Sequence, residues 1–71
     1  MSEKRLIEIT FDKNSNLSIR IECEHGSLFA MNWNSCDDLI GTRYMANELI
    51  ADKRIADVFD VSFVEEKDEA N

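Results

Sequence analysis

The strongest constraint on the fold is a strict alternation of apolar and polar residues across residues 17–23. Apolar side chains occupy every second position from Leu17 to Cys23, and polar side chains stand between them. A period of two places neighbouring side chains on opposite faces of an extended chain, so this segment predicts a half-buried β-strand. The same pattern predicts three further strands, over residues 4–11, 28–33 and 58–64.

Two short turns separate the first three of these strands. Residues 12–16 read Asp-Lys-Asn-Ser-Asn, and short Asx and Ser side chains bond to their own backbone in turns. Residues 24–27 contain Gly26, which adopts a positive φ without steric cost. Strands joined by turns this short pair in the antiparallel sense, so residues 4–33 predict a three-stranded meander.

One helix is predicted between the third and fourth strands. Ser35 is a natural N-cap, and Asp38 three residues later completes an Asp variant of the capping box. At about 100° per residue, one face of this helix is apolar, and we assign it to the core. The helix is expected to end near residues 51–53. Its core face carries Cys36, Leu39, Ala46, Leu49 and Ile50.

These elements predict an α+β fold with the order β-β-β-α-β. The helix covers one face of a small, mostly antiparallel four-stranded sheet, and the last strand returns beside the first, parallel to it, by a right-handed crossover. A chain of 71 residues has room for one core, so residues 1–64 are predicted to form a single domain. Residues 65–71 carry one small apolar residue and are expected to form a disordered acidic tail.

The charge balance is strongly acidic, with 8 basic and 15 acidic residues and a net charge of −7. Nucleic acids and anionic lipids are bound through basic surfaces, so the chain is not expected to bind either directly. An acidic protein attracts a basic protein partner, because complementary fields speed association. The alternative is that the charge only keeps a small protein in solution.

The sequence also bears on location. No stretch approaches the roughly 18 apolar residues of a membrane span, and no apolar run behind the N-terminus suits a signal peptide. The two cysteines, Cys23 and Cys36, are too few for a disulfide scaffold. We therefore expect a cytoplasmic protein with both thiols reduced and no contact with a membrane.

The residues predict no enzyme site, metal site or cofactor. The single histidine, His25, lies in a turn near Cys23, and Cys36 could approach these two residues in the fold. A zinc site needs four ligands at recognisable spacing, and a phosphate site needs a Gly-rich loop. Neither pattern is present, and one helix on a four-stranded sheet offers little depth for a catalytic pocket.

Two groups of residues are candidates for contact with a partner. The first is a row of carboxylates that spans roughly 22 Å of the predicted helix and suits the cationic groove of a nucleic-acid enzyme, as a mimic of nucleic acid. The alternative for this row is an ordinary solvated helix face. The second group is a pair of aromatic residues at the edge of the predicted core, because aromatic side chains are enriched at interfaces. The row is Asp37, Asp38, Glu48 and Asp52, and the aromatic pair is Trp33 and Tyr44.

Residues 49–58, with the sequence Leu-Ile-Ala-Asp-Lys-Arg-Ile-Ala-Asp-Val, resemble the junction between helix and last strand in small phage-encoded inhibitors. The family they most resemble is the Dmd antitoxins of T-even phages, which block host endoribonuclease toxins. The resemblance implies a phage protein that evades host defence by direct binding to a nuclease, CRISPR complex, restriction enzyme or polymerase. It covers this junction and not the N-terminal hairpin, so no functional residue is carried over.

Two functions follow as expectations. The first is a small acidic inhibitor that blocks a host nucleic-acid-handling protein by direct protein–protein contact. The second is a structural or regulatory subunit that acts through a homodimer or a larger complex. A continuous acidic face without an apolar patch favours the first function. An exposed apolar patch on a self-complementary surface favours the second function.

Overall fold

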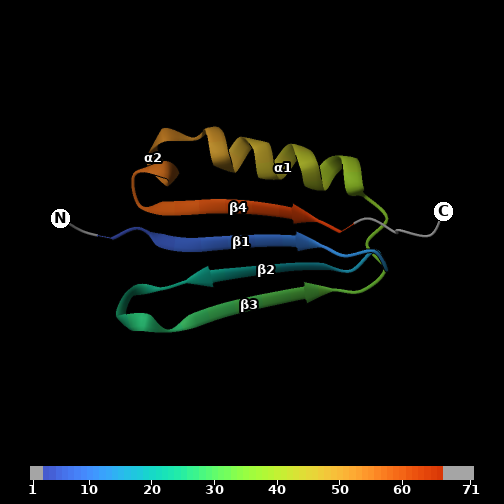
Figure 1. Ribbon diagram of the computed structural model, residues 1–71, viewed down its shortest axis with the longest axis horizontal. Coiled ribbons are helices and arrows are strands. Elements are labelled where there is room, and N and C mark those ends of the chain that lie inside the picture. The colour runs from blue at the N-terminus through green and yellow to red at the C-terminus, as the bar shows by residue number, and fades with distance from the viewer. Residues whose placement is uncertain (1–2, 67–71) are drawn as a thin grey trace.

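The computed structural model describes residues 3–66, which form a four-stranded sheet with one main helix packed against one of its faces (Figure 1). The strands follow one another across the sheet in the order β3-β2-β1-β4. The elements are β1 Arg5–Phe11, β2 Leu17–Glu22, a 3-10 turn Glu24–Gly26, β3 Leu28–Trp33, α1 Leu39–Ala51, α2 Lys53–Ala56 and β4 Phe59–Glu65.

The strand pairing confirms the predicted α+β fold. β1 pairs with β2 and β2 with β3 in the antiparallel sense, and β4 lies beside β1 and runs parallel to it. In this register Ile9 stands opposite Ile19 on one side and Phe63 on the other, and Ile19 stands opposite Met31. Residues opposite one another share a face of the sheet, so the alternate apolar residues of all four strands lie together.

The first turn is held by the carboxylate of Asp12. Its Oδ1 accepts the backbone N–H groups of Asn14 at 2.8 Å and Asn16 at 2.9 Å. The backbone bond from Asn16 is the main cause that lowers the pKa of Asp12, and Lys13 nearby adds to the effect. Because the bonds favour the charged form, this carboxylate stabilises the fold above its unfolded pKa.

This turn makes part of the stability dependent on pH. The stabilisation by Asp12 is present above the unfolded pKa of the carboxyl group and is lost as the pH falls through its lowered folded pKa. We expect Asp12→Asn to destabilise the protein at neutral pH and to differ progressively less from the wild type as the pH falls. Urea unfolding of both proteins along the acid limb measures this difference, with Asp37→Asn as the exposed control. A difference between Asp12→Asn and wild type that stays constant down to acid pH would contradict the assignment.

The helix begins later than the sequence predicts, and its cap is a different residue. The predicted N-cap, Ser35, has a φ of 57° and its N–H donates to the side chain of Asn16 at 3.2 Å. The next N–H, of Cys36, donates to the carbonyl of Ser15 at 2.6 Å. These two bonds hold Ser35 and Cys36 against the first turn, so their N–H groups are already bonded and the helix cannot start there.

Asp38 is the N-cap instead, and its Oδ1 accepts the N–H of Gly41 at 2.7 Å. A Cβ at position 41 would lie on the Asp38 carboxyl group, so this cap geometry needs glycine there. The other end agrees with the prediction, because α1 ends at Ala51. Asp52 follows, and its carboxylate accepts the N–H groups of Arg54 and Ile55 at the start of α2.

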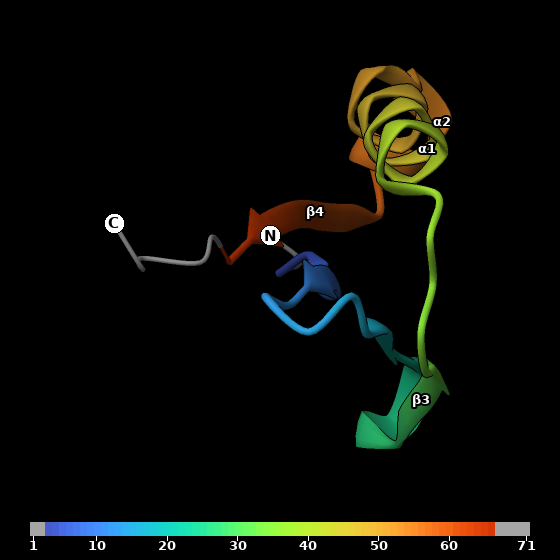
Figure 2. The ribbon, with the colours of Figure 1, turned by 90° about the vertical axis from the view of Figure 1, so that its right-hand side faces the viewer.

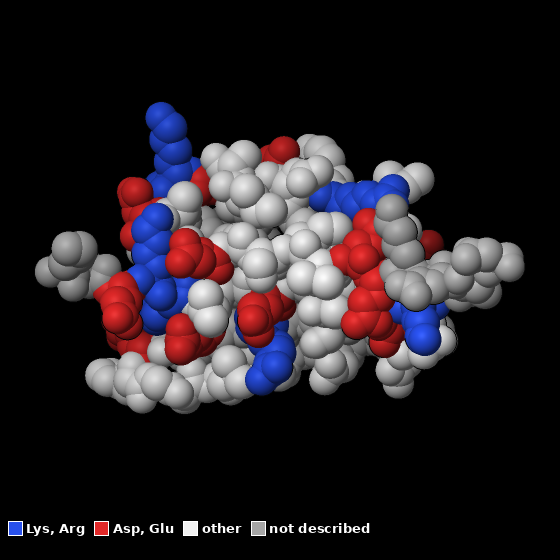
Figure 3. Space-filling view, viewed as in Figure 1, with Lys and Arg blue, Asp and Glu red and all other residues white. Residues whose placement is uncertain are grey.

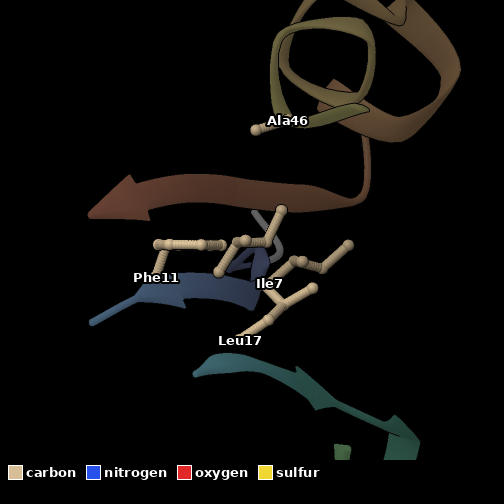
Figure 4. Close-up of a cluster of buried hydrophobic side chains, with 5 residues drawn as sticks. Ile7, Phe11, Leu17 and Ala46 are labelled. Atoms are coloured by element: carbon tan, nitrogen blue, oxygen red, sulfur yellow. The ribbon is translucent and has the colours of Figure 1, made fainter. Parts of the chain in front are cut away.

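The core lies where α1 meets β1 and its neighbours. Figure 4 shows Ala46 facing the sheet, above the side chains of the first two strands. Ile9 and Ala46 have no exposed surface. Thr42 is also buried, and its hydroxyl donates to the carbonyl of Asp38 at 2.8 Å, so its polar atom is satisfied. The buried apolar residues are Ile7, Ile9, Phe11, Leu17 and Ala46.

The prediction that Ile50 lies on the core face of the helix is wrong, because its side chain is 47% exposed. α1 packs on β4, which is an edge strand, so one flank of the helix extends beyond the sheet. Ile50 lies on that flank and lines a shallow depression of about 180 Å³ together with Phe59 and Val61. The helical period alone could not show that no strand lies beneath this flank.

One helix covers only half of the apolar sheet face. A helix with its side chains is about 10–12 Å wide, and strands lie about 4.8 Å apart, so a helix spans about two strands. Figure 2 shows α1 beside the β4 end of the sheet, far from β3 at the other end. Apart from Leu17, which is buried, the apolar side chains of β2 and β3 on this face are therefore left without a helix above them.

The C-terminal boundary also differs from the prediction. Glu65, which we predict to begin the tail, is the last residue of β4 and stands opposite Phe11. The N–H of Glu66 donates to the carbonyl of Phe11 at 2.8 Å. The rest of the predicted tail, residues 67–71, lies outside the described residues. Within residues 3–66, no helix is long and apolar enough to cross a membrane.

Candidate protein-binding surface

The uncovered half of the sheet presents a continuous apolar surface, which we call the open face. Phe29 is 53% exposed and Trp33 is 44% exposed, although both point to the same side of the sheet as the core. The register places Phe29 opposite Ile21 and Met31 opposite Ile19, so the surface is built from cross-strand pairs. The open face consists of Ile19, Ile21, Phe29, Met31 and Trp33.

A second apolar surface lies on α1, on the side away from its own sheet. Ile40 is 77% exposed and Tyr44 is 68% exposed, and Asn47 and Ala51 are exposed beside them. At 100° per residue these four positions fall within about 60° of one another. We call Ile40, Tyr44, Asn47 and Ala51 the outer strip. None of the four residues carries a charge.

The composition of α1 explains this second surface. Its thirteen residues include only two charged ones, Arg43 and Glu48. Arg43 bonds in a bidentate manner to Glu65 at the end of β4, at 2.9 and 2.6 Å, so its charge is directed back to the sheet. A helix that is apolar on both sides is usually buried on both sides. The scarcity of charge in residues 39–51 is the signal in the sequence that marks Ile40 as a candidate contact residue, which the helical period alone does not.

The open face ends in a strand edge without protection. β3 is outermost in the described sheet. Cys23 and Ser27 form a hydrogen-bonded pair at the start of the β2–β3 ladder, and such pairs alternate along antiparallel strands. The N–H and C=O groups of Leu28, Ala30 and Asn32 therefore point away from β2, toward the open edge of the sheet. Edge strands are normally protected by charge, Pro or a covering element, and β3 has neither charge nor Pro. The strand and the face are thus suited to contact with another chain.

The predicted acidic row does not form along one helix. Of its four residues only Glu48 lies within α1, because the helix starts at Leu39 and ends at Ala51. The carboxylates of Asp38 and Asp52 are engaged as helix caps. Asp37 and Glu48 are exposed. A partner would have to compete with the cap bonds to use the other two carboxylates.

The aromatic pair lies on two different surfaces. Trp33 belongs to the open face and Tyr44 to the outer strip, and both side chains are exposed, in keeping with their place at the edge of the predicted core. Their part in binding stays a prediction. In the view of Figure 3, acidic and basic side chains lie together, mainly toward the two ends of the strands and also in a smaller group between them. This side of the protein therefore has no single-sign acidic field.

Cys36 does not come near Cys23 and His25. Cys23 and His25 line a depression of about 220 Å³ at one end of the sheet. Cys36 lies at the other end, where its N–H bonds to Ser15 beside the first turn. The length of β2 separates them, about 20 Å for six residues. Among the described residues, no group of three or more His, Cys, Asp or Glu side chains is placed to hold a metal ion.

Comparison with known protein families, curated proteins and solved structures finds no match for this chain.

Proposed function

We propose that the protein acts by binding another protein chain through the open face, without chemistry of its own. The observation that supports this proposal is the half-covered sheet, with Phe29 and Trp33 each about half exposed on the side of the core. Among the two expected functions, an apolar patch of this kind favours a structural or regulatory subunit of a homodimer or larger complex. The broken acidic row gives the groove-blocking inhibitor less support.

The free energies expected from apolar burial and from surface ion pairs also favour binding through the open face. An aromatic side chain buries about 150–250 Å², so half-exposed Phe29 and Trp33 each offer roughly 100 Å² to a partner. At about 25 cal/mol per Å², burial of either one contributes about 2.5 kcal/mol. An exposed ion pair contributes about 0.2–1 kcal/mol. The apolar residues would therefore set the affinity, and the acidic residues would mainly affect the association rate.

The inhibitor of a nucleic-acid-handling protein is the second candidate. It is favoured by the net charge of −7 and by the exposed carboxylates of Asp37 and Glu48. In this case the partner would present a basic nucleic-acid-binding groove, and long-range attraction would raise the association rate. Added salt would then slow binding, because the Debye length falls from about 10 Å at 0.1 M to 3 Å at 1 M.

Binding kinetics at two salt concentrations separate the two candidates. The partner is identified by capture with the immobilised wild-type chain, and a second copy is among the candidates. We expect Trp33→Ala to speed dissociation by about 30-fold, as for loss of a 2 kcal/mol anchor. We expect Asp37→Lys with Glu48→Lys to change the affinity by less than about threefold. Asp52 is left unchanged because its carboxylate caps α2.

The matched control is Leu28→Ala. Leu28 is also a half-exposed apolar residue of β3, but it points to the opposite face of the sheet. Its replacement should leave the dissociation rate unchanged. If the double charge reversal abolishes association while Trp33→Ala has no effect, the open face is not the binding surface. The groove-blocking inhibitor would then be the better description.

A further inference from the structure

We propose that the open face binds the outer strip of a second copy of this chain. In the resulting symmetric dimer, each α1 lies between its own sheet and the open face of its partner. This inference rests on the proposed function and names the occupant of the same surface.

The fit follows from two surfaces that lack a partner within one chain. The sheet has an apolar half that is two strands wide and has no helix above it. The helix has an apolar side with no sheet against it, formed around Ile40 and Tyr44. A helix covers about two strands. The open face is therefore wide enough to hold one helix, and the outer strip is the side of a helix that has no sheet against it.

The two contacts between the copies are equivalent, so the dimer is a closed assembly. If the outer strip of one copy sits on the open face of the other, a two-fold axis places the second strip on the first open face. Both contacts are then made at once, and neither the open face nor the outer strip is left to recruit a third copy. The two helices form one layer between two sheets, so each helix is buried on both of its apolar sides.

Charge is compatible with a second copy despite the net charge of −7 on each chain. The five residues of the open face and the four of the outer strip are all uncharged. Like charges facing each other across an interface would destabilise it, and none meets here. Glu48, one helical turn after Tyr44, borders the outer strip and is exposed, so solvent and salt screen its repulsion.

The area is at the level that a specific dimer requires. The exposed parts of Phe29, Trp33 and Tyr44 amount to roughly 100 Å² or more each. With Ile40 and the partly buried members of the open face, two copies would bury on the order of 1,000 Å² in total, which is about the lower bound for a specific interface. Pairing of two β3 edges would instead leave the open face and the outer strip both uncovered.

The test measures the oligomeric state of the full-length chain by sedimentation velocity, up to about 100 µM, where a micromolar dimer is fully formed. The strip variant is Tyr44→Lys and the face variant is Met31→Glu, with Phe29→Glu in reserve if Met31→Glu fails to fold by circular dichroism. Each variant alone should weaken the dimer at least tenfold. The control Leu28→Lys, on the opposite sheet face, should leave the dimer unchanged.

Mixing the two variants gives the decisive result. In a mixed dimer one contact joins an unaltered strip to an unaltered face, and the other joins the new Lys to the new Glu. The mixture should therefore form dimers at a concentration at which each variant alone is largely monomeric. A monomeric wild type, a dimer that survives Tyr44→Lys, or two monomeric variants that stay monomeric when mixed would each overturn the inference.

The two proposals can fail separately. If the wild type is monomeric but Trp33→Ala still speeds release of a captured protein, the dimer is wrong and the proposed function stands. If Trp33→Ala affects neither the dimer nor any captured protein, both proposals are wrong.

Discussion

Replacing Ile9 by Ala is expected to lower the free energy of unfolding by about 2–5 kcal/mol. Ile9 has no exposed surface and stands in β1 between Ile19 of β2 and Phe63 of β4. Its truncation would leave a cavity that the surrounding strands cannot fill without losing their register. A domain of this size has a total stability of only several kcal/mol. The variant should therefore be largely unfolded near 37 °C.

Urea unfolding followed by circular dichroism measures this loss. Ile19→Ala is the matched control, with the same change of side chain on the same face of the sheet. Ile19 belongs to the open face and is only partly buried. From the alternation alone, replacing Ile19 by Ala would be expected to lower the free energy of unfolding as much as replacing a core residue. The structure predicts a smaller loss, because Ile19 is only partly buried. Equal losses for the two variants would mean that a helix or partner covers both positions.

Enlarging Ala46 to Leu is expected to destabilise the protein by about 1–3 kcal/mol. Ala46 has no exposed surface, and its side chain points from α1 toward the sheet (Figure 4). Additional methyl groups there would push the helix away from β1 and β4, because the strands below are fixed by their pairing. The small side chain at position 46 thus sets the distance between helix and sheet.

The urea midpoint of Ala46→Leu is compared with that of Ala30→Leu. Ala30 is exposed on the opposite face of the sheet, so the same enlargement meets no packed neighbour there. We expect the Ala30 variant to unfold within about 0.5 kcal/mol of the wild type, as surface changes usually do. A stabilised Ala46→Leu would show that the interface between helix and sheet contains unfilled space.

The strands and their pairing were accessible from local patterns. Alternation across Leu17 to Cys23 reports which side chains share a face, because the period of two is a property of the extended backbone itself. Short turns rich in Asx and Ser residues, such as the one around Asp12, require antiparallel neighbours. The parallel return of β4 beside β1 followed from the length of the helical connection.

The start of the helix was not accessible in this way. Ser35 and Asp38 are both good caps by residue type. The choice between them depends on bonds from Ser35 and Cys36 to the turn at Ser15 and Asn16, about twenty positions earlier in the chain. Those bonds exist only after β1, β2 and β3 have paired. The acidic row was drawn on the longer helix and was therefore broken by the same contacts.

By itself, the sequence determined which side chains are apolar and which face of each strand they share. That information is local, since it depends on backbone periods of two and 3.6 residues. Only the tertiary structure decided which of those apolar residues are buried. α1 lies over the β4 end of the sheet, so Ile9 is enclosed while Phe29 and Trp33, on the same face, stay exposed. A helix is about two strands wide and the sheet has four. Where the helix sits therefore determines which half becomes the core and which half is open to a partner.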